Sequence, residues 1–201
     1  MDLAVFALTF GAIFIVELPD KTFIAALVLS TRYKPLAVWI GVGVAFGVQT
    51  LVAVLAGKVA TLLPEALIQA VTLAIFLLGA VLLFKTAPGA DEEEKEQEEE
   101  YAARATEPKT FFRAAVASFL VLFAAEWGDL SQLLTINMVA RYDDHISVFL
   151  GAWGALLTVS GLAVLAGRVL LRYMRLSVLH YIGGTVCLVL AAVTAYELIA
   201  G

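Results

Sequence analysis

Four carboxylates stand inside long apolar stretches of this 201-residue chain, and they occur as two pairs. Glu17 and Asp20 form the first pair, and Glu126 and Asp129 form the second. The two residues of each pair are three positions apart, which places both carboxylates on one face of a helix. A charged group at the centre of a bilayer costs at least ~2.5 kcal/mol, so residues of this kind mark a functional site.

The polar residues close to these pairs offer oxygen or positive charge. The supporting candidates are Thr22, Ser131, Gln132, Lys21 and Gln49. Oxygen ligands favour Mg²⁺, Ca²⁺ or Mn²⁺ over Cu⁺ or Zn²⁺. Four carboxylates in one dry cavity would repel each other, and a divalent cation or protons would relieve that repulsion. The alternative is pairing with basic groups, but Lys21 is the only one at that depth and leaves three acids uncompensated.

Several of these polar residues also have a purely structural reading. Pro19 lacks an N–H group and frees the carbonyl of Ile15, which could bind a cation or simply mark a kink. Gly128, at the equivalent position of the second pair, permits a bend or a close backbone approach. Gln49 could face the cavity or form a hydrogen bond between helices.

The composition places these residues in a membrane protein. The chain is 62% hydrophobic and its mean hydropathy is +0.94, which is too apolar for a single soluble core. A helix that crosses the bilayer needs about 20 mostly apolar residues. Six segments qualify, and we expect all-α spans over about 3–29, 36–56, 66–84, 113–140, 146–167 and 178–198.

The two halves of the chain repeat the same polar pattern. Glu17–Thr22 falls on Glu126–Ser131 at an offset of 109 positions, and Leu55–Lys58 falls on Leu165–Arg168 at an offset of 110. Because each half holds three spans, the second copy must enter the membrane inverted, as in many secondary transporters. We therefore expect a first three-helix repeat over 1–86, an acidic cytoplasmic linker over 87–110 and a second three-helix repeat over 111–201.

Basic residues are strongly asymmetric between the two sides of the expected spans. One side holds Arg32, Lys34, Lys85, Lys95, Arg104, Lys109, Arg113, Arg168, Arg172 and Arg175. The other side holds only Lys58 and Arg141. The positive-inside rule then predicts that both termini lie outside. We expect a multi-pass protein of a prokaryotic plasma membrane. The acidic run within 91–100 is expected in the cytoplasm, as a solvated helix or as disorder.

The doubled motif Glu-x-Gly-Asp-Lys/Arg-Thr/Ser resembles that of the transmembrane protein 165 family, also called uncharacterised protein family 16. This family belongs to the cation–proton exchangers of the lysine-exporter superfamily. The resemblance implies a Ca²⁺/Mn²⁺:H⁺ antiporter without a resident cofactor, in which the four paired acids and two hydroxyls form the site. Pro19 and Leu130 depart from the motif, since they replace a glycine and the second basic residue.

Three classes of function are compatible with membrane carboxylates. The leading hypothesis is a secondary transporter that exports Mn²⁺, or else Ca²⁺, in exchange for H⁺ by alternating access at the midplane. A passive cation channel could use the same carboxylates. A metal-dependent enzyme would need ligand histidines or a nucleophile with its base, and His145 and His180 lie outside the expected cavity. We therefore do not expect an enzyme. The expected partners are a lipid bilayer, a metal ion and protons, and we expect no binding to nucleic acid.

Overall fold

The computed structural model describes residues 1–18, 21–104, 110–173 and 176–200. These residues form helices joined by short connections and contain no strand, which confirms the all-α class. The elements are α1 (Leu3–Glu17), α2 (Lys21–Arg32), α3 (Pro35–Ala60), α4 (Glu65–Thr86), the 3₁₀ turn η1 (Ala87–Gly89), α5 (Ala90–Arg104), α6 (Phe111–Ala125), α7 (Leu130–Tyr142), α8 (His145–Tyr173) and α9 (Leu176–Ala200).

The helices α3, α4, α8 and α9 are each long and apolar enough to cross a membrane. Two further candidate spans are bent pairs, since α1 and α2 meet at 70° and α6 and α7 meet at 75°. The described chain thus holds four to six candidate spans of a multi-pass membrane protein. The expected spans over 3–29 and 113–140 are not continuous helices, and each is broken close to its carboxylate pair.

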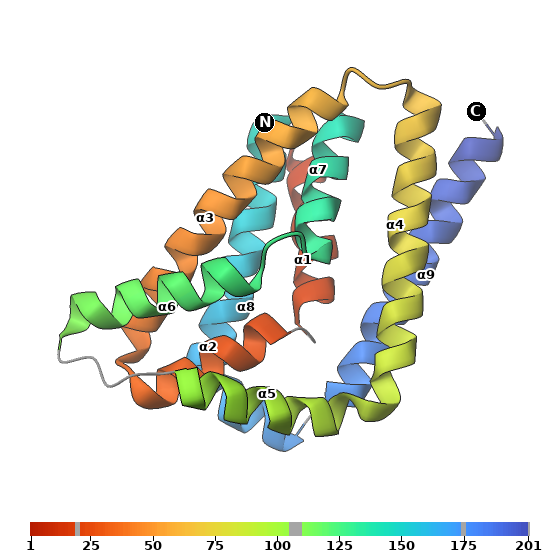
Figure 1. Cartoon of the computed structure of the whole chain (residues 1–201). Coiled ribbons are helices and arrows are strands. Elements are labelled where there is room, and N and C mark those ends of the chain that lie inside the picture. Colours follow the sequence, from red (N-terminus) through yellow and green to blue (C-terminus); the bar gives the residue numbers. More distant parts are fainter. Residues whose placement is uncertain (19–20, 105–109, 174–175, 201) are drawn as a thin grey trace.

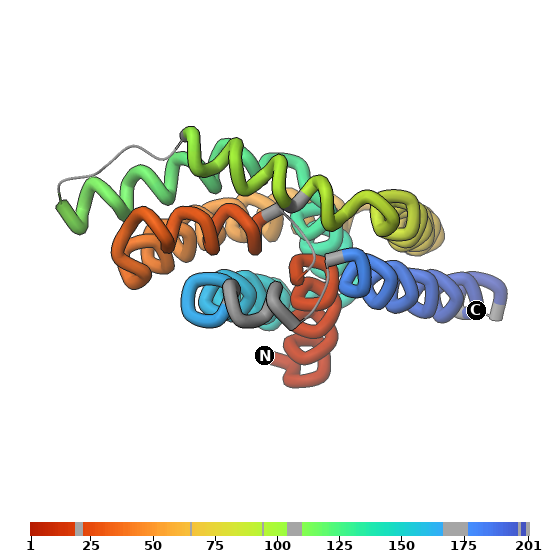
Figure 2. The backbone as a smooth tube through the Cα atoms, turned by 90° about the horizontal axis from the view of Figure 1, so that it is seen from below, coloured from red at the N-terminus to blue at the C-terminus, as the bar shows by residue number. Residues whose placement is uncertain are grey.

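The chain termini and the connections between helices lie at two opposite ends of the molecule. Both termini and the connection between α3 and α4 lie at one end, and α5 lies across the other (Figure 1). Helices α4 and α9 pack side by side along one edge, as the view from below also shows (Figure 2). Helix α1 packs on α8, and α6 packs on α3.

Small residues bring the central helices into backbone contact. A side chain added at Gly41 of α3 would collide with the carbonyl of Ala115 on α6. A Cβ atom added at Gly151 of α8 would lie 2.7 Å from the carbonyl oxygen of Phe6 on α1. Small residues at helix interfaces permit this approach, which gives close packing inside a membrane.

Two tryptophans form hydrogen bonds between α3 and α8. The indole Nε1 of Trp39 donates to the carbonyl of Leu157 at 3.0 Å, and that of Trp153 donates to the carbonyl of Gly43 at 2.9 Å. Each helix therefore supplies one tryptophan that binds the backbone of the other. Such hydrogen bonds hold neighbouring helices together where lipid offers no competing partner.

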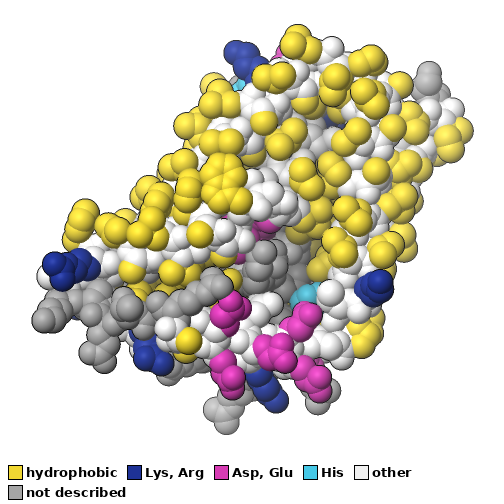
Figure 3. Space-filling model, viewed as in Figure 1, with side chains coloured by type: hydrophobic (Ala, Val, Ile, Leu, Met, Phe, Trp, Pro, Cys, Tyr) yellow, Lys and Arg dark blue, Asp and Glu magenta, His cyan; other side chains and the backbone are white. Residues whose placement is uncertain are grey.

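The acidic segment forms the helix α5, so the helical alternative is the correct one. Its Asp91 carboxylate accepts hydrogen bonds from Ser177 at the start of α9, from the backbone N at 3.0 Å and from Oγ at 3.1 Å. Ala90 and Tyr101 are buried, whereas Glu92 and Glu93 are exposed. Only one face of α5 is solvated, and the carboxylates gather at this end of the molecule (Figure 3).

Candidate functional site

Two glutamates occupy the points where the bent spans break. Glu17 is the last residue of α1, and Glu126 is the C-cap of α6. Their side chains are 0% and 1% exposed, so both are shielded from lipid and from water. A carboxylate in such a place is costly to keep charged unless a cation or a hydrogen-bond donor compensates it. The structure thus puts the two predicted glutamates in equivalent, buried positions.

Asp129 begins the helix that follows the second break. It is the N-cap of α7, and its carboxylate accepts hydrogen bonds from the backbone N of Gln132 at 3.0 Å and from Ser131 Oγ at 2.8 Å. Aspartate is favoured at this position because it satisfies an unpaired N–H group and faces the positive end of the helix dipole. Local sequence therefore fixes Asp129 and Ser131 together beside Glu126.

Two glutamines hold the break between α6 and α7. The side chain of Gln132 donates to the carbonyl of Glu126 and accepts from the backbone N of Gly128 at 3.2 Å. Gln49 reaches from α3 and donates through Nε2 to the carbonyl of Phe123 at 3.1 Å. The last carbonyls of a helix have no partner within it, so these amides replace the lost hydrogen bonds. Of the two readings of Gln49, the bond between helices is the one observed.

Gly128 makes the turn itself possible. Its φ angle is +75°, in the left-handed region that residues with a Cβ atom rarely adopt. No atom lies within 4 Å of the position where a Cβ would stand, so the requirement for glycine comes from the backbone alone. The second break is therefore a true interruption with its own turn, rather than a simple kink.

The first break is described only in part. Thr22 is 0% exposed, and its hydroxyl has no hydrogen-bond partner among the described residues. Pro19 and Asp20 lie outside those residues, and so does the side chain of Lys21. The roles assigned to these three therefore stay predictions.

The four-carboxylate site as a whole also stays a prediction. Within the described ranges, which omit Asp20, no three His, Cys, Asp or Glu side chains lie close enough together to hold a metal ion. The residues that the structure does join are Glu126, Asp129, Ser131 and Gln132, around one break. The hydroxyl and carbonyl oxygens at this break extend the set of possible hard ligands.

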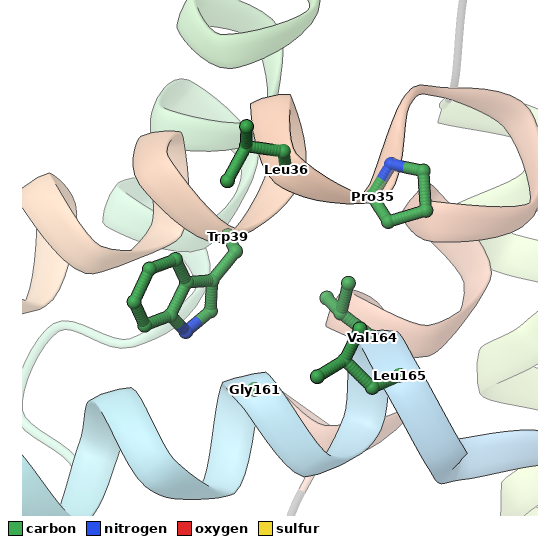
Figure 4. A pocket seen from close by; sticks show the side chains of 6 residues that line it. All are labelled: Pro35, Leu36, Trp39, Gly161, Val164 and Leu165. Atoms are coloured by element: carbon green, nitrogen blue, oxygen red, sulfur yellow. The ribbon is translucent and has the colours of Figure 1, made fainter.

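An apolar groove lies elsewhere, between α3 and α8 (Figure 4). It has a volume of about 380 Å³ and is lined by Pro35, Leu36, Trp39, Gly161, Val164 and Leu165. No charged side chain lines it, and the polar atom of Trp39 is already bound to Leu157. This groove has no ligand for a cation and is separate from the carboxylates.

Two buried hydroxyls were missed by the sequence reasoning. Thr9 on α1 and Ser118 on α6 are both 0% exposed. They are 109 positions apart, which is the offset that relates Glu17 to Glu126. The signal that could have found them is therefore the repeat itself, since the same comparison that paired the acids also pairs these hydroxyls.

Comparison with known families and proteins agrees with the motif. A family model described as the divalent cation/proton antiporter GDT1 matches residues 5–91 and 114–201. Protein PAM71, chloroplastic, of Arabidopsis thaliana is 32% identical over 212 residues, which cover 96% of this chain and 57% of that protein. GDT1-like protein 1, chloroplastic, of Oryza sativa subsp. indica is 30% identical over 96% of this chain and 62% of its own length.

A cyanobacterial relative is of more similar size. GDT1-like protein sll0615 of Synechocystis sp. is 32% identical over 173 residues, which cover 76% of this chain and 80% of that protein. The chain thus spans less than two thirds of the plant proteins but most of the cyanobacterial one. No solved structure matches the chain.

Proposed function

This chain belongs to the GDT1 family of divalent cation/proton antiporters, and from that premise we propose that it exchanges a divalent cation for protons across a membrane. Mn²⁺ is the first candidate and Ca²⁺ the second; the candidate ligands are hard oxygens, which suit both ions. The family consists of transporters rather than enzymes, and the resemblance to the transmembrane protein 165 family is confirmed by the match.

The observation that carries the proposal is the burial of Glu17 and Glu126 at the ends of two broken spans. A buried carboxylate is costly to keep charged, and a proton or a bound cation removes that cost. Metal binding needs ionised oxygens, so an arriving cation expels the protons. If the site crosses the membrane either protonated or loaded with metal, exchange follows without a separate proton path. Interacting carboxylates titrate together, so the exchanged protons belong to the set and not to one residue.

Alternating access further requires two halves that can rock about the site, and we propose the inverted repeat for this role. Two matching contacts between the halves support the inverted repeat. Gly41 lies against the carbonyl of Ala115, and Gly151 lies against the carbonyl of Phe6. Gly151 follows Gly41 by 110 positions, and Ala115 follows Phe6 by 109. Each half thus offers the same glycine to the same backbone position of the other half, as an inverted duplication demands.

The proposed halves are residues 1–86 and 111–201, joined by the acidic segment. Their limits coincide with the end of α4 at Thr86 and the start of α6 at Phe111. We place the α5 end in the cytoplasm and both termini outside, because the basic residues gather in the connections at the α5 end. The proposed location is a prokaryotic plasma membrane.

The test measures metal uptake and internal pH in the same proteoliposomes. Glu17→Gln and Glu126→Gln keep the side-chain shape and remove an ionisable group, so both should abolish Mn²⁺ uptake and proton release together. Asp129→Asn is a sharper variant, because asparagine still caps a helix and only the charge is lost. Glu93→Gln, on the exposed face of α5, is the matched control and should exchange normally.

Two results would contradict the proposal in different ways. Full metal flux without any proton movement would favour the passive channel. Normal exchange by the Glu126→Gln protein would show that the carboxylate site is wrongly assigned. Competition should separate the ions as well, since Ca²⁺ should compete with Mn²⁺ and Cu⁺ should not.

A further inference from the structure

Two hydroxyls buried in the broken spans lack the partners that such groups normally find. Thr9 Oγ1 and Ser118 Oγ have no hydrogen bond within the described part of the chain, and both residues are 0% exposed. Several hydroxyls on other helices bond to a carbonyl one turn earlier, as Thr72 does to Ile68 at 2.7 Å, although Thr22 on α2 does not. A buried polar group without a partner is costly and calls for a functional explanation.

These hydroxyls have the same relation to their glutamates. Thr9 precedes Glu17 by eight residues, and Ser118 precedes Glu126 by eight. At 1.5 Å per residue, each hydroxyl is about 12 Å from its glutamate along the helix axis. The equal interval follows from the common offset of 109 positions, so that each hydroxyl has the same place on its helix relative to its glutamate.

One bulky apolar residue stands between each hydroxyl and its glutamate. Ile13 occupies this position on α1 and Leu122 on α6, and both are 0% exposed. The order hydroxyl, apolar residue, glutamate therefore recurs at steps of four residues, which lie along one side of a helix. Apolar constrictions of this kind stop ions by excluding water.

The two series lie on helices that reach the breaks from different parts of the molecule. Helix α1 runs inward from the end that holds both termini (Figure 1). Helix α6 begins at Phe111, after α5 in the chain, and lies across the molecule above α5 before it reaches the second break (Figure 1). In the inverted repeat proposed above, α1 and α6 enter from opposite sides, so that Thr9 and Ile13 belong to one side and Ser118 and Leu122 to the other.

We infer that Thr9 and Ser118 are the polar positions of two opposite access routes for the hydrated cation, each closed toward the glutamates by Ile13 or Leu122. The inference rests on the proposed antiport function. Hydroxyl oxygen is a suitable ligand for a cation that exchanges its water shell. Both routes are closed in this structure, since all four side chains are buried. Opening one side would hydrate its hydroxyl. On α1 such a movement would separate Thr9 from Gly151 of α8, since a Cβ added at Gly151 would lie 3.1 Å from the Cβ of Thr9.

Cysteine accessibility tests the two routes. Thr9→Cys and Ser118→Cys are made separately with Cys187 replaced by alanine, and oriented proteoliposomes are treated with an impermeant maleimide on either side. Thr9→Cys should react only from the terminal end and Ser118→Cys only from the α5 end. A change of pH or Mn²⁺ that raises one labelling rate by about tenfold should lower the other, as for a two-state equilibrium.

Thr194→Cys on α9 is the matched control, because Thr194 is 1% exposed and its hydroxyl is bonded to Leu190 at 3.0 Å. It should react from neither side under any condition. Labelling of Thr9→Cys and Ser118→Cys from the same side, or of neither in a protein that exchanges normally, would overturn the inference and leave the antiport function standing.

Removal of the hydroxyls gives an independent result. Thr9→Val and Ser118→Ala should slow maximal exchange by about tenfold and leave the half-saturating Mn²⁺ concentration unchanged, because binding at the glutamates is untouched. If the hydroxyls had no role in transport, these variants would be at least as thermally stable as the parent and would exchange at the full rate. That outcome would also overturn the inference.

Discussion

At the level of single residues, polar side chains around the α6–α7 break serve the backbone as well as the proposed cation. Gln132 binds the carbonyl of Glu126 and the backbone N of Gly128, and Asp129 caps α7. The same residues therefore hold the backbone at the break and offer candidate ligand oxygens. A substitution that frees a ligand oxygen also leaves a backbone group without its hydrogen-bond partner. Substitutions that separate the two effects are the most informative.

The turn at Gly128 offers such a separation. Gly128→Ala should destabilise the protein by ~1–2 kcal/mol, because alanine is strained at a positive φ, and asparagine should cost less. The measurement is denaturant unfolding in detergent micelles. Gly11→Ala is the control, since a Cβ there also meets nothing within 4 Å but the residue is helical, and it should be neutral or slightly stabilising. Equal stability of the alanine variants at 128 and 11 would contradict the role of the turn.

A second prediction for a single residue concerns the pH dependence of stability, at the end of the molecule that holds both termini. Hydrogen bonds from the Ser147 hydroxyl and backbone N, and from the backbone N of Asp2, lower the pKa of Asp144 to about 2. A lowered pKa in the folded state adds stability above the unfolded pKa of about 3.8, and this contribution disappears as pH falls through about 2. The melting temperature of Asp144→Ala should thus lie below that of the parent at pH 5–7.

The difference between the two proteins should shrink between about pH 4 and pH 2, where the parent's own carboxylate becomes protonated. Comparison of parent and variant at each pH removes the effects of the other carboxylates. A difference that stays constant down to pH 2 would show that the Asp144 hydrogen bonds do not favour its charged form.

At the level of elements, α5 has two faces with different roles. One face packs on α2 and α9, and through Asp91 it binds the first turn of α9. The other face carries exposed glutamates, among them Glu92 and Glu93. The acidic residues of α5 are therefore not equivalent, and substitutions on its two faces should change the stability of the protein by very different amounts.

Asp91→Ala should destabilise the protein by about 1 kcal/mol, the usual cost of losing a helix cap. Glu93→Ala, two residues further on the exposed side, should change stability by less than about 0.5 kcal/mol. Thermal unfolding of both variants in the same detergent provides the measurement. If Glu93→Ala proved as costly as Asp91→Ala, the division of α5 into a packed and a solvated face would be wrong.

At the level of the whole molecule, both termini and the α3–α4 connection share one end, and α5 occupies the other (Figure 1). This arrangement is the one that six crossings of a membrane require. It leaves the absolute orientation to the basic residues, whose excess at the α5 end predicts a cytoplasmic α5.

Labelling in intact cells checks this orientation. With Cys187 replaced by alanine, Leu62→Cys should react with an impermeant reagent from outside, and Glu93→Cys should react only after the membrane is opened. Both positions are exposed, Leu62 at 83%, whereas the nearby Ala90 is fully buried and unsuitable. Outside labelling of Glu93→Cys alone would reverse the proposed topology.

The sequence by itself determined the lipid-facing class, the approximate spans and the two carboxylate pairs. It could do so because a bilayer imposes apolar runs of a known length and makes every internal charge conspicuous. The expectation that Glu126 and Asp129 share one face of a continuous helix was wrong, because Glu126 caps the end of α6, Asp129 caps the start of α7 and the turn at Gly128 separates them.

Tertiary structure alone decided how these parts meet. Gln49 binds the carbonyl of Phe123 across 74 positions, and Asp91 binds Ser177 across 86. The repeat pairs Thr9 with Ser118, but only the structure shows that neither hydroxyl has a partner among the described residues, because many helical hydroxyls bond to a carbonyl on their own helix. Such contacts depend on how helices are rotated and spaced against each other, and hydropathy sets neither, since lipid and a neighbouring helix are equally apolar surroundings.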